Sequence, residues 1–233
     1  MYAKSSFTFS LITLLTTCPL YAEVVLDGTL GHRGALEGPH YAIGAELGSQ
    51  HGGNLFHSFS DFNINTGESA TFSGHHTIKN VISRITGGNP SHINGVLSST
   101  IPNADMYFLN PNGMIFGPNA RLDVLGSFHA STANTLYFQD GGQFNASQPN
   151  NSLLTIAPIK AFGFLDNHIA PISVEGHGEI TKADWESHPI GLNVSEGKTL
   201  SLIGGDIKIK NGTFYRTVTH QSRRKYCPVC WRK

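Results

Sequence analysis

The stretch that decides the fold is Asn110-Pro111-Asn112-Gly113-Met114-Ile115-Phe116-Gly117-Pro118-Asn119-Ala120. It places a short apolar strand between two turns rich in Asn, Pro and Gly. A strand-like run, Met106–Leu109, precedes this stretch, and another, Arg121–Leu125, follows it. Three short strands and two tight turns within about twenty residues are typical of a stacked β-coil.

The same alternation of apolar and polar residues recurs along the chain, and no window keeps the three- and four-residue apolar spacing of a helix. The period-two runs are Asn54–Phe59, Phe62–Asn65, Ala70–Ser73, Val81–Ile85, Ser127–Ala130, Thr135–Phe138, Gln143–Ala146, Leu153–Ile156, Ile172–Val174, Gly178–Ile180, Leu192–Val194, Leu200–Ile203 and Asp206–Ile209. Because these strands are short and closely spaced, they favour a β-solenoid over an immunoglobulin-like sandwich. We expect an all-β parallel β-helix whose repeat has no fixed period, in which each strand pairs with its equivalent in the next coil.

Three segments differ in character from this body. Residues 1–22 resemble a signal peptide, with Lys4 as the basic residue, a short apolar run, and expected cleavage between Ala22 and Glu23. The Gly- and His-rich segment Gly31–His51 is expected to form loops or to cap the coil stack, because an open solenoid end exposes strand edges.

The basic segment 213–233 loses the alternation, and we expect this tail to be disordered. The β-helix domain is therefore predicted to span residues 23–212.

Composition and charge exclude several classes of function. The body carries all 16 acidic residues but only nine of the 16 basic ones, a net charge of about −7, which argues against nucleic acid as the main ligand. It contains no cysteine, so its stability must come from a packed core. Phe108, Ile115 and Phe116 are expected core residues.

The sequence offers no catalytic or metal-binding constellation. Glycosidases need paired carboxylates facing one bond, whereas the acidic residues here are spread singly: Asp61, Asp105, Asp123, Asp140 and Asp166. The histidines, His51, His57 and the pair His75-His76 among them, are expected on the surface or in turns. Cys227 and Cys230 are interpreted as an accidental pair in the tail. We therefore predict no enzyme activity, no cofactor and no metal.

Together these residues resemble the filamentous haemagglutinin N-terminal domain, also called the two-partner secretion (TPS) domain. The similarity runs in family order from about Glu23 to about Lys210. It is carried by Phe59–Ile64, Ile85–Ser91, Ile93–Gly95, Phe108–Gly117, Gly126–Ala133, Gly191–Val194 and Gly197–Asp206.

The resemblance implies a right-handed parallel β-helix with an N-terminal β cap and a small extra-helical β-element. It also implies export to the periplasm of a Gram-negative-type envelope. There the domain would act as secretion signal and folding template of an adhesin- or haemagglutinin-like exoprotein, secreted or displayed at the cell surface. The implied partner is an outer-membrane β-barrel transporter with POTRA domains, and a host or neighbouring-cell ligand is a further possible partner. An alternative on the same fold is a stand-alone carbohydrate- or cell-binding adhesive module.

This chain departs from the family pattern in two ways. Some relatives carry an upstream Asn-Pro-Asn-Leu motif, which is absent from the comparable region Gly74–Asn80. Relatives also continue through long repeats, whereas this pattern is lost after Asp206, so we expect a truncated form of a longer exoprotein.

Two interpretations of Asn110-Pro111-Asn112-Gly113 remain open from the sequence. Pro111 sets the φ angle of the first corner of a type I turn, Asn112 suits the second, and Gly113 adopts a positive φ at low cost. Asn side chains can also bond the local backbone as Asx turns do. The motif can therefore serve to shape the β-helix, to contact the transporter, or both.

Overall fold

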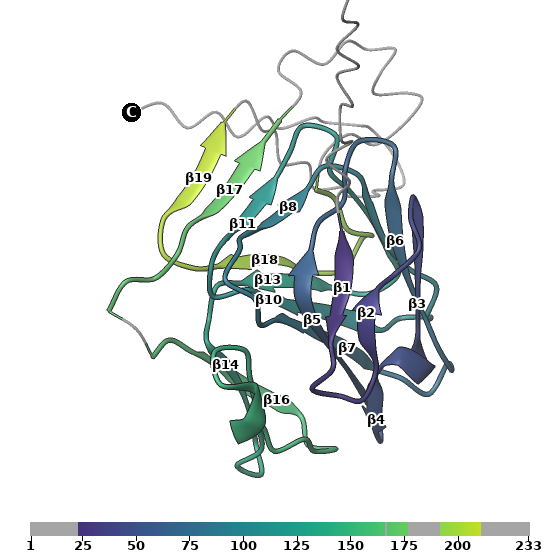
Figure 1. Ribbon diagram of the computed structural model, residues 1–233, viewed down its shortest axis with the longest axis vertical. Coiled ribbons are helices and arrows are strands. Elements are labelled where there is room, and N and C mark those ends of the chain that lie inside the picture. Colours follow the sequence, from purple (N-terminus) through teal and green to yellow (C-terminus); the bar gives the residue numbers. More distant parts are fainter. Residues whose placement is uncertain (1–22, 166, 177–191, 211–233) are drawn as a thin grey trace, which may run out of the picture.

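The computed structural model describes residues 23–165, 167–176 and 192–210. They form a parallel β-helix of about four turns, and no α-helix is found among them. Each full turn places one strand in each of three sheets (Figure 1). The predicted all-β solenoid is therefore confirmed.

The parallel ladders of the three sheets run along the solenoid. In the first sheet they join β5 (Asn54–Phe62), β7 (Asn80–Ile85), β10 (Asp105–Leu109), β13 (Phe128–Ser131) and β18 (Leu200–Ile203). In the second they join β8 (Ser91–Ile93), β11 (Met114–Phe116), β17 (Ile172–Glu175) and β19 (Ile207–Lys210). In the third they join β3 (His40–Gly44), β6 (Ser69–Ser73), β9 (Val96–Ser99) and β12 (Arg121–Val124).

The irregular repeat has a simple structural origin. The aligned inward positions Leu55, Val81, Met106 and Phe128 lie 26, 25 and 22 residues apart. The next aligned residue, Leu200, follows only after a long insertion. Coils of different length thus keep one register, which explains why the sequence shows no fixed period.

The N-terminal cap consists of antiparallel strands on the free edge of β5. β1 (Val24–Asp27) pairs with one part of β5 and with β2 (Arg33–Ala35), while β4 (Ser49–His51) pairs with the other part of β5. These strands satisfy backbone groups that an open edge would expose. The segment expected to loop or cap is more regular than predicted, since it also contributes β3, the first strand of the third sheet, and a single 3-10 turn, η1 (Ala45–Leu47).

The solenoid interior is a continuous apolar core. Aromatic rings pack edge to face inside it, with ring centroids 4.6 Å apart for Phe62 and Phe108 and 5.0 Å apart for Phe59 and Phe62. Phe108 and Phe116 are buried there, as predicted. The expectation for Ile115 is wrong, because it aligns with the outward-facing His92 on the second sheet and is only half-buried.

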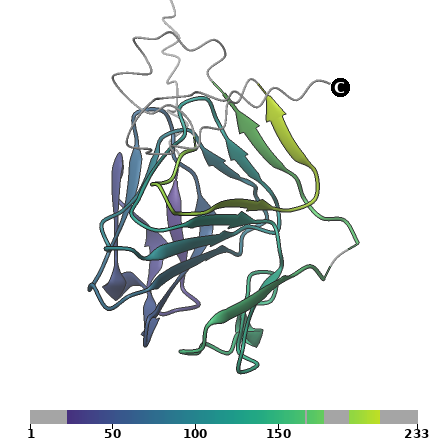
Figure 2. The same ribbon diagram turned by 180° about the vertical axis from the view of Figure 1, so that it is seen from behind.

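An extra-helical sheet is inserted between β13 and β17. It contains β14 (Thr135–Phe138), β15 (Gln143–Asn145) and β16 (Ile159–Gly163) in the antiparallel order β15-β14-β16, with η2 (Pro149–Asn151) after β15. It stands as a separate layer beside the coils in both views (Figures 1 and 2). Its Leu136, Phe138 and Phe144 pack on Phe56 and Ile82 of the first sheet. The outer face of that sheet is therefore buried as well as the inner one.

Three expected strands differ in the structure. In Phe62–Asn65, Phe62 ends β5 and Ile64 makes only an isolated bridge to Ile93. Leu153–Ile156 makes only an isolated bridge, between Leu153 and Gln143, and the strand begins instead at Ile159. Leu192–Val194 is not a strand either, although Leu192 is buried in the core. Gly178–Ile180 lies outside the described residues.

Candidate recognition site at the Asn-Pro-Asn-Gly corner

The motif Asn110–Gly113 forms the corner between β10 and β11. The Gly113 N–H donates to the Asn110 carbonyl oxygen at 3.1 Å, which closes a β-turn with Pro111 and Asn112 in its central positions. The Asn112 N–H donates to Asn110 Oδ1 at 2.9 Å, so the turn is also an Asx turn. Gly113 has a φ of +111°, a backbone conformation open to glycine but strained for other residues.

Asn110 faces the interior of this corner and is fully buried. Its amide Nδ2 donates to the Asn89 carbonyl oxygen at 3.1 Å and to Ser91 Oγ at 3.0 Å, both in the preceding coil. Its backbone N–H donates to the Ser131 carbonyl oxygen of the following coil at 2.9 Å. Asn110 therefore ties three coils together and is inaccessible to a partner.

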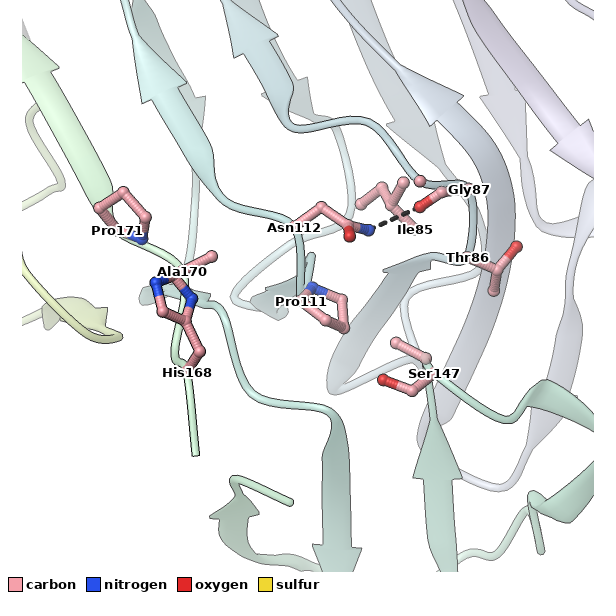
Figure 3. Close-up of a pocket in the computed structure, with 11 residues that line it drawn as sticks. Ile85, Thr86, Gly87, Pro111, Asn112, Ser147, His168, Ala170 and Pro171 are labelled. Atoms are coloured by element: carbon pink, nitrogen blue, oxygen red, sulfur yellow. Dashed lines mark hydrogen bonds between the residues drawn. The ribbon is translucent and has the colours of Figure 1, made fainter. Parts of the chain in front are cut away.

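Pro111 and Asn112 occupy the outer side of the same corner. Asn112 is exposed and Pro111 half-buried. The Asn112 Nδ2 group donates to the Gly87 carbonyl oxygen at 2.6 Å, which holds the side chain against the preceding corner (Figure 3). The motif is thus divided: Asn110 is internal, whereas Pro111 and Asn112 are available at the surface.

A surface pocket of about 580 Å³ opens beside this corner. Figure 3 shows Pro111 and Asn112 on one side of it, Ser147 of the extra-helical insertion below them, and His168, Ala170 and Pro171 opposite. The complete lining is Ile85, Thr86, Gly87, Gly88, Pro111, Asn112, Ala146, Ser147, His168, Ala170 and Pro171. Only His168 among these residues has an ionisable side chain. The pocket therefore suits an uncharged segment of a partner better than an ion.

Arg84, which the sequence did not single out, lies behind the pocket at 1% exposure. Its Nε donates to Ser58 Oγ at 2.7 Å and its Nη2 to Thr29 Oγ1 at 2.8 Å. Its Nη1 donates to the Asn145 carbonyl oxygen at 2.7 Å. Burial lowers the pKa of Arg84 to about 10, and the nearby Asp27 carboxylate opposes this shift, so the guanidinium stays charged at neutral pH.

Asp27 is the negative end of the same network. Its carboxylate accepts hydrogen bonds from Ser58 Oγ at 2.6 Å, Thr86 Oγ1 at 2.7 Å and Thr29 Oγ1 at 2.8 Å. Desolvation alone would raise the pKa of Asp27, but the hydrogen bonds from Ser58, Thr29 and Thr86 outweigh it and lower this pKa. Asp27 is therefore ionised at neutral pH and balances Arg84.

Among the histidines that the structure describes, His57 contradicts the expectation of surface or turn positions. His75 and His76 are exposed surface residues, as predicted. His57 is instead fully buried on β5, where its ring packs against Phe59 and Phe72 and its Nε2 is 3.1 Å from the Gly44 carbonyl oxygen. Within the described residues, no group of three or more His, Cys, Asp or Glu side chains could hold a metal ion.

Several predicted features fall outside the described ranges. They are the signal peptide 1–22 with Ala22, the segment 213–233, and the residues Asp166, Cys227 and Cys230. Glu23, on the other side of the predicted cleavage site, is the first described residue. No helix in the described part of the chain is long and apolar enough to span a membrane.

Comparison with known proteins gives one family match. The model of the TPS secretion domain matches residues 22–225, which include the corner, the pocket and the Arg84 network. A search of curated proteins finds no match.

Proposed function

Because this chain belongs to the TPS secretion domain family, whose members mark exoproteins of Gram-negative bacteria for two-partner secretion, we propose that its β-helix is the signal recognised in the periplasm by the POTRA domains of an outer-membrane transporter. The passenger is an adhesin- or haemagglutinin-like exoprotein, released or displayed at the cell surface. The domain acts as cargo and binding partner, and we propose no catalytic step.

The observation that carries this proposal is the division of the corner. If the motif only shaped the coil, Asn110 would be enough, because its bonds already join neighbouring coils. Pro111 and Asn112 instead present a stiff, preorganised surface beside an uncharged pocket. A preorganised surface lowers the entropy lost on binding. We therefore place the transporter contact on Pro111, Asn112 and the pocket, with Asn110 and Gly113 holding the corner in shape.

The end of the described solenoid supports a role as folding template. In β19, Ile207 and Ile209 align in parallel register with the buried Ile172 and Val174 of β17. They therefore face inward, yet they are 40% and 48% exposed. An inward apolar row of this kind stabilises a further coil that stacks on it, because burial of its surface offsets the entropy of ordering the coil.

Secretion assays test the proposal directly. The full chain is expressed with and without a candidate two-partner outer-membrane transporter, and the extracellular and periplasmic fractions are compared. We expect release only with the transporter, and a strong loss of release for Asn112→Ala with unchanged circular dichroism. Release that does not depend on the transporter would refute the function, and normal release of Asn112→Ala would refute the site.

A further inference from the structure

We infer that Arg84 is a positioning residue for transporter recognition, which it serves from inside the molecule by holding two separate walls of the pocket in register. This inference rests on the proposed function. One wall is the corner of residues 85–88, which directly follows Arg84 in the chain. The other wall is Ala146 and Ser147 of the extra-helical insertion.

The first wall is fixed through Asp27. Thr86 lines the pocket, and its hydroxyl donates to Asp27 Oδ2 at 2.7 Å. The Ser58 hydroxyl donates to the same carboxylate oxygen at 2.6 Å and itself accepts from Arg84 Nε. Arg84 and the pocket residue Thr86 therefore share one anchor in the N-terminal cap.

The second wall is fixed by the other end of the guanidinium. Arg84 Nη1 donates to the Asn145 carbonyl oxygen at 2.7 Å and to Ser152 Oγ at 2.5 Å. The guanidinium carbon also lies 4.2 Å from the centroid of the Phe144 ring. Residues 146 and 147 follow directly, and Figure 3 shows Ser147 below Pro111 and Asn112. The position of this wall relative to the corner thus depends on Arg84.

Only arginine can serve both walls at once. Its planar guanidinium offers five N–H donors in a fixed fork, whereas lysine offers a single compact ammonium group. Buried ion networks also add little stability compared with apolar packing of the same volume. A role in fixing the geometry of the pocket accounts for a buried arginine at this position better than a role in stability alone.

The test measures binding of the full mature chain to the purified POTRA domains of the two-partner transporter that supports its release, together with hydrogen exchange of residues 143–152. We expect Arg84→Lys to fold, to exchange faster in residues 143–152, and to bind about tenfold more weakly, because the loosened wall must be ordered on binding. Ser152→Ala removes the acceptor of Arg84 Nη1 and of the Asn145 N–H but leaves the other guanidinium bonds in place, and a loss of about threefold is expected. Ser173→Ala, an equally half-buried serine on β17, is the matched control and should bind normally.

A double-mutant cycle separates positioning from general damage. If Arg84 acts through the pocket, Arg84→Lys should cause little further loss of binding in an Asn112→Ala background. An equal loss in both backgrounds would overturn the inference, as would normal binding of Arg84→Lys despite faster exchange. If Arg84→Lys does not fold, Ser152→Ala decides by the same criteria. Normal binding of Asn112→Ala would overturn the proposed docking site as well, whereas the other outcomes overturn only the role of Arg84.

Discussion

Arg84 and Asp27 are joined through two hydroxyl groups, each of which accepts a hydrogen bond from the guanidinium and donates one to the carboxylate. Ser58 Oγ lies 2.7 Å from Arg84 Nε and 2.6 Å from Asp27 Oδ2. Thr29 Oγ1 lies 2.8 Å both from Arg84 Nη2 and from Asp27 Oδ1. The network joins the N-terminal cap to the solenoid, and the Arg84 bond to the Asn145 carbonyl oxygen extends it to the extra-helical sheet. Three parts of the domain are therefore coupled through one buried cation.

The first prediction concerns Asp27→Asn. The amide keeps the shape of the carboxylate but leaves Arg84 without its counter-charge and forces the Ser58 and Thr86 hydroxyls to reorient. We expect the free energy of unfolding, from urea denaturation at pH 7, to fall by about 1–3 kcal/mol. Asp206→Asn, an exposed matched control, should change it by less than about 0.5 kcal/mol. Equal effects of the two variants would show that the network contributes nothing to stability.

The second prediction is a pH dependence centred on His57. Desolvation lowers the pKa of this ring to about 4, against 6.5 for an unperturbed histidine, and its Nδ1 is buried without a hydrogen-bond partner. Between these two values the unfolded chain binds the proton and the folded chain does not. Stability should therefore fall as the pH drops from about 6.5 to about 4, by about 1.4 kcal/mol per unit and about 3 kcal/mol in total.

The measurement for His57 compares urea denaturation at several pH values for the wild type and His57→Phe. The variant loses the bond to the Gly44 carbonyl oxygen, so its stability at pH 7 can differ from that of the wild type. The informative quantity is the slope with pH, which should become flatter. Burial also lowers the pKa of His129, but that contribution is common to both proteins. An unchanged slope would show that His57 is protonated without penalty.

The sequence predicts the coil architecture well because its signals are local. Alternation and the Asn110–Gly113 turn are determined by neighbouring residues, so the strands and the Asx turn could be anticipated. The partners of Arg84 cannot be found in this way, since Thr29, Asn145 and Ser152 lie 55, 61 and 68 residues away.

Coverage by distant segments explains the other differences. Phe56 lies in a run that alternates as a half-buried strand would, yet it is buried because the inserted sheet brings Phe138 and Phe144 onto its outer face. His57 follows Phe56 in the strand. Because successive side chains of a strand face opposite sides, His57 points into the solenoid core.

The third prediction concerns Gly113→Ala. Residue 113 has a φ of +111°, and an added Cβ would lie 3.1 Å from the Pro171 carbonyl oxygen of the next coil. Both the backbone strain and the close contact oppose the change, so we expect a loss of about 1–3 kcal/mol in thermal or urea unfolding. Gly141→Ala is a suitable control for backbone strain alone, because it also has a positive φ but no atom within 4 Å of the added Cβ. A smaller loss for Gly113→Ala than for Gly141→Ala would contradict this account of the corner.

The last prediction separates shape from recognition within one motif. Asn110→Ala deletes the side-chain bonds to the Asn89 carbonyl oxygen and the buried Ser91 hydroxyl, and it removes the acceptor of the Asn112 N–H. The unfolding free energy should therefore fall by about 2–3 kcal/mol. Asn112→Ala removes the bond from an exposed side chain to the Gly87 carbonyl oxygen, so we expect a loss below about 1 kcal/mol.

Secretion should show a different pattern from stability in these two variants. If Pro111 and Asn112 contact the transporter, Asn112→Ala reduces secretion more than its small change in stability can explain. Asn110→Ala should reduce secretion only as far as it unfolds the domain, so conditions that restore its fold, such as lower temperature, should restore its export. If secretion instead follows stability in the same proportion for both variants, the corner acts solely through the fold, and the transporter binds elsewhere on the β-helix.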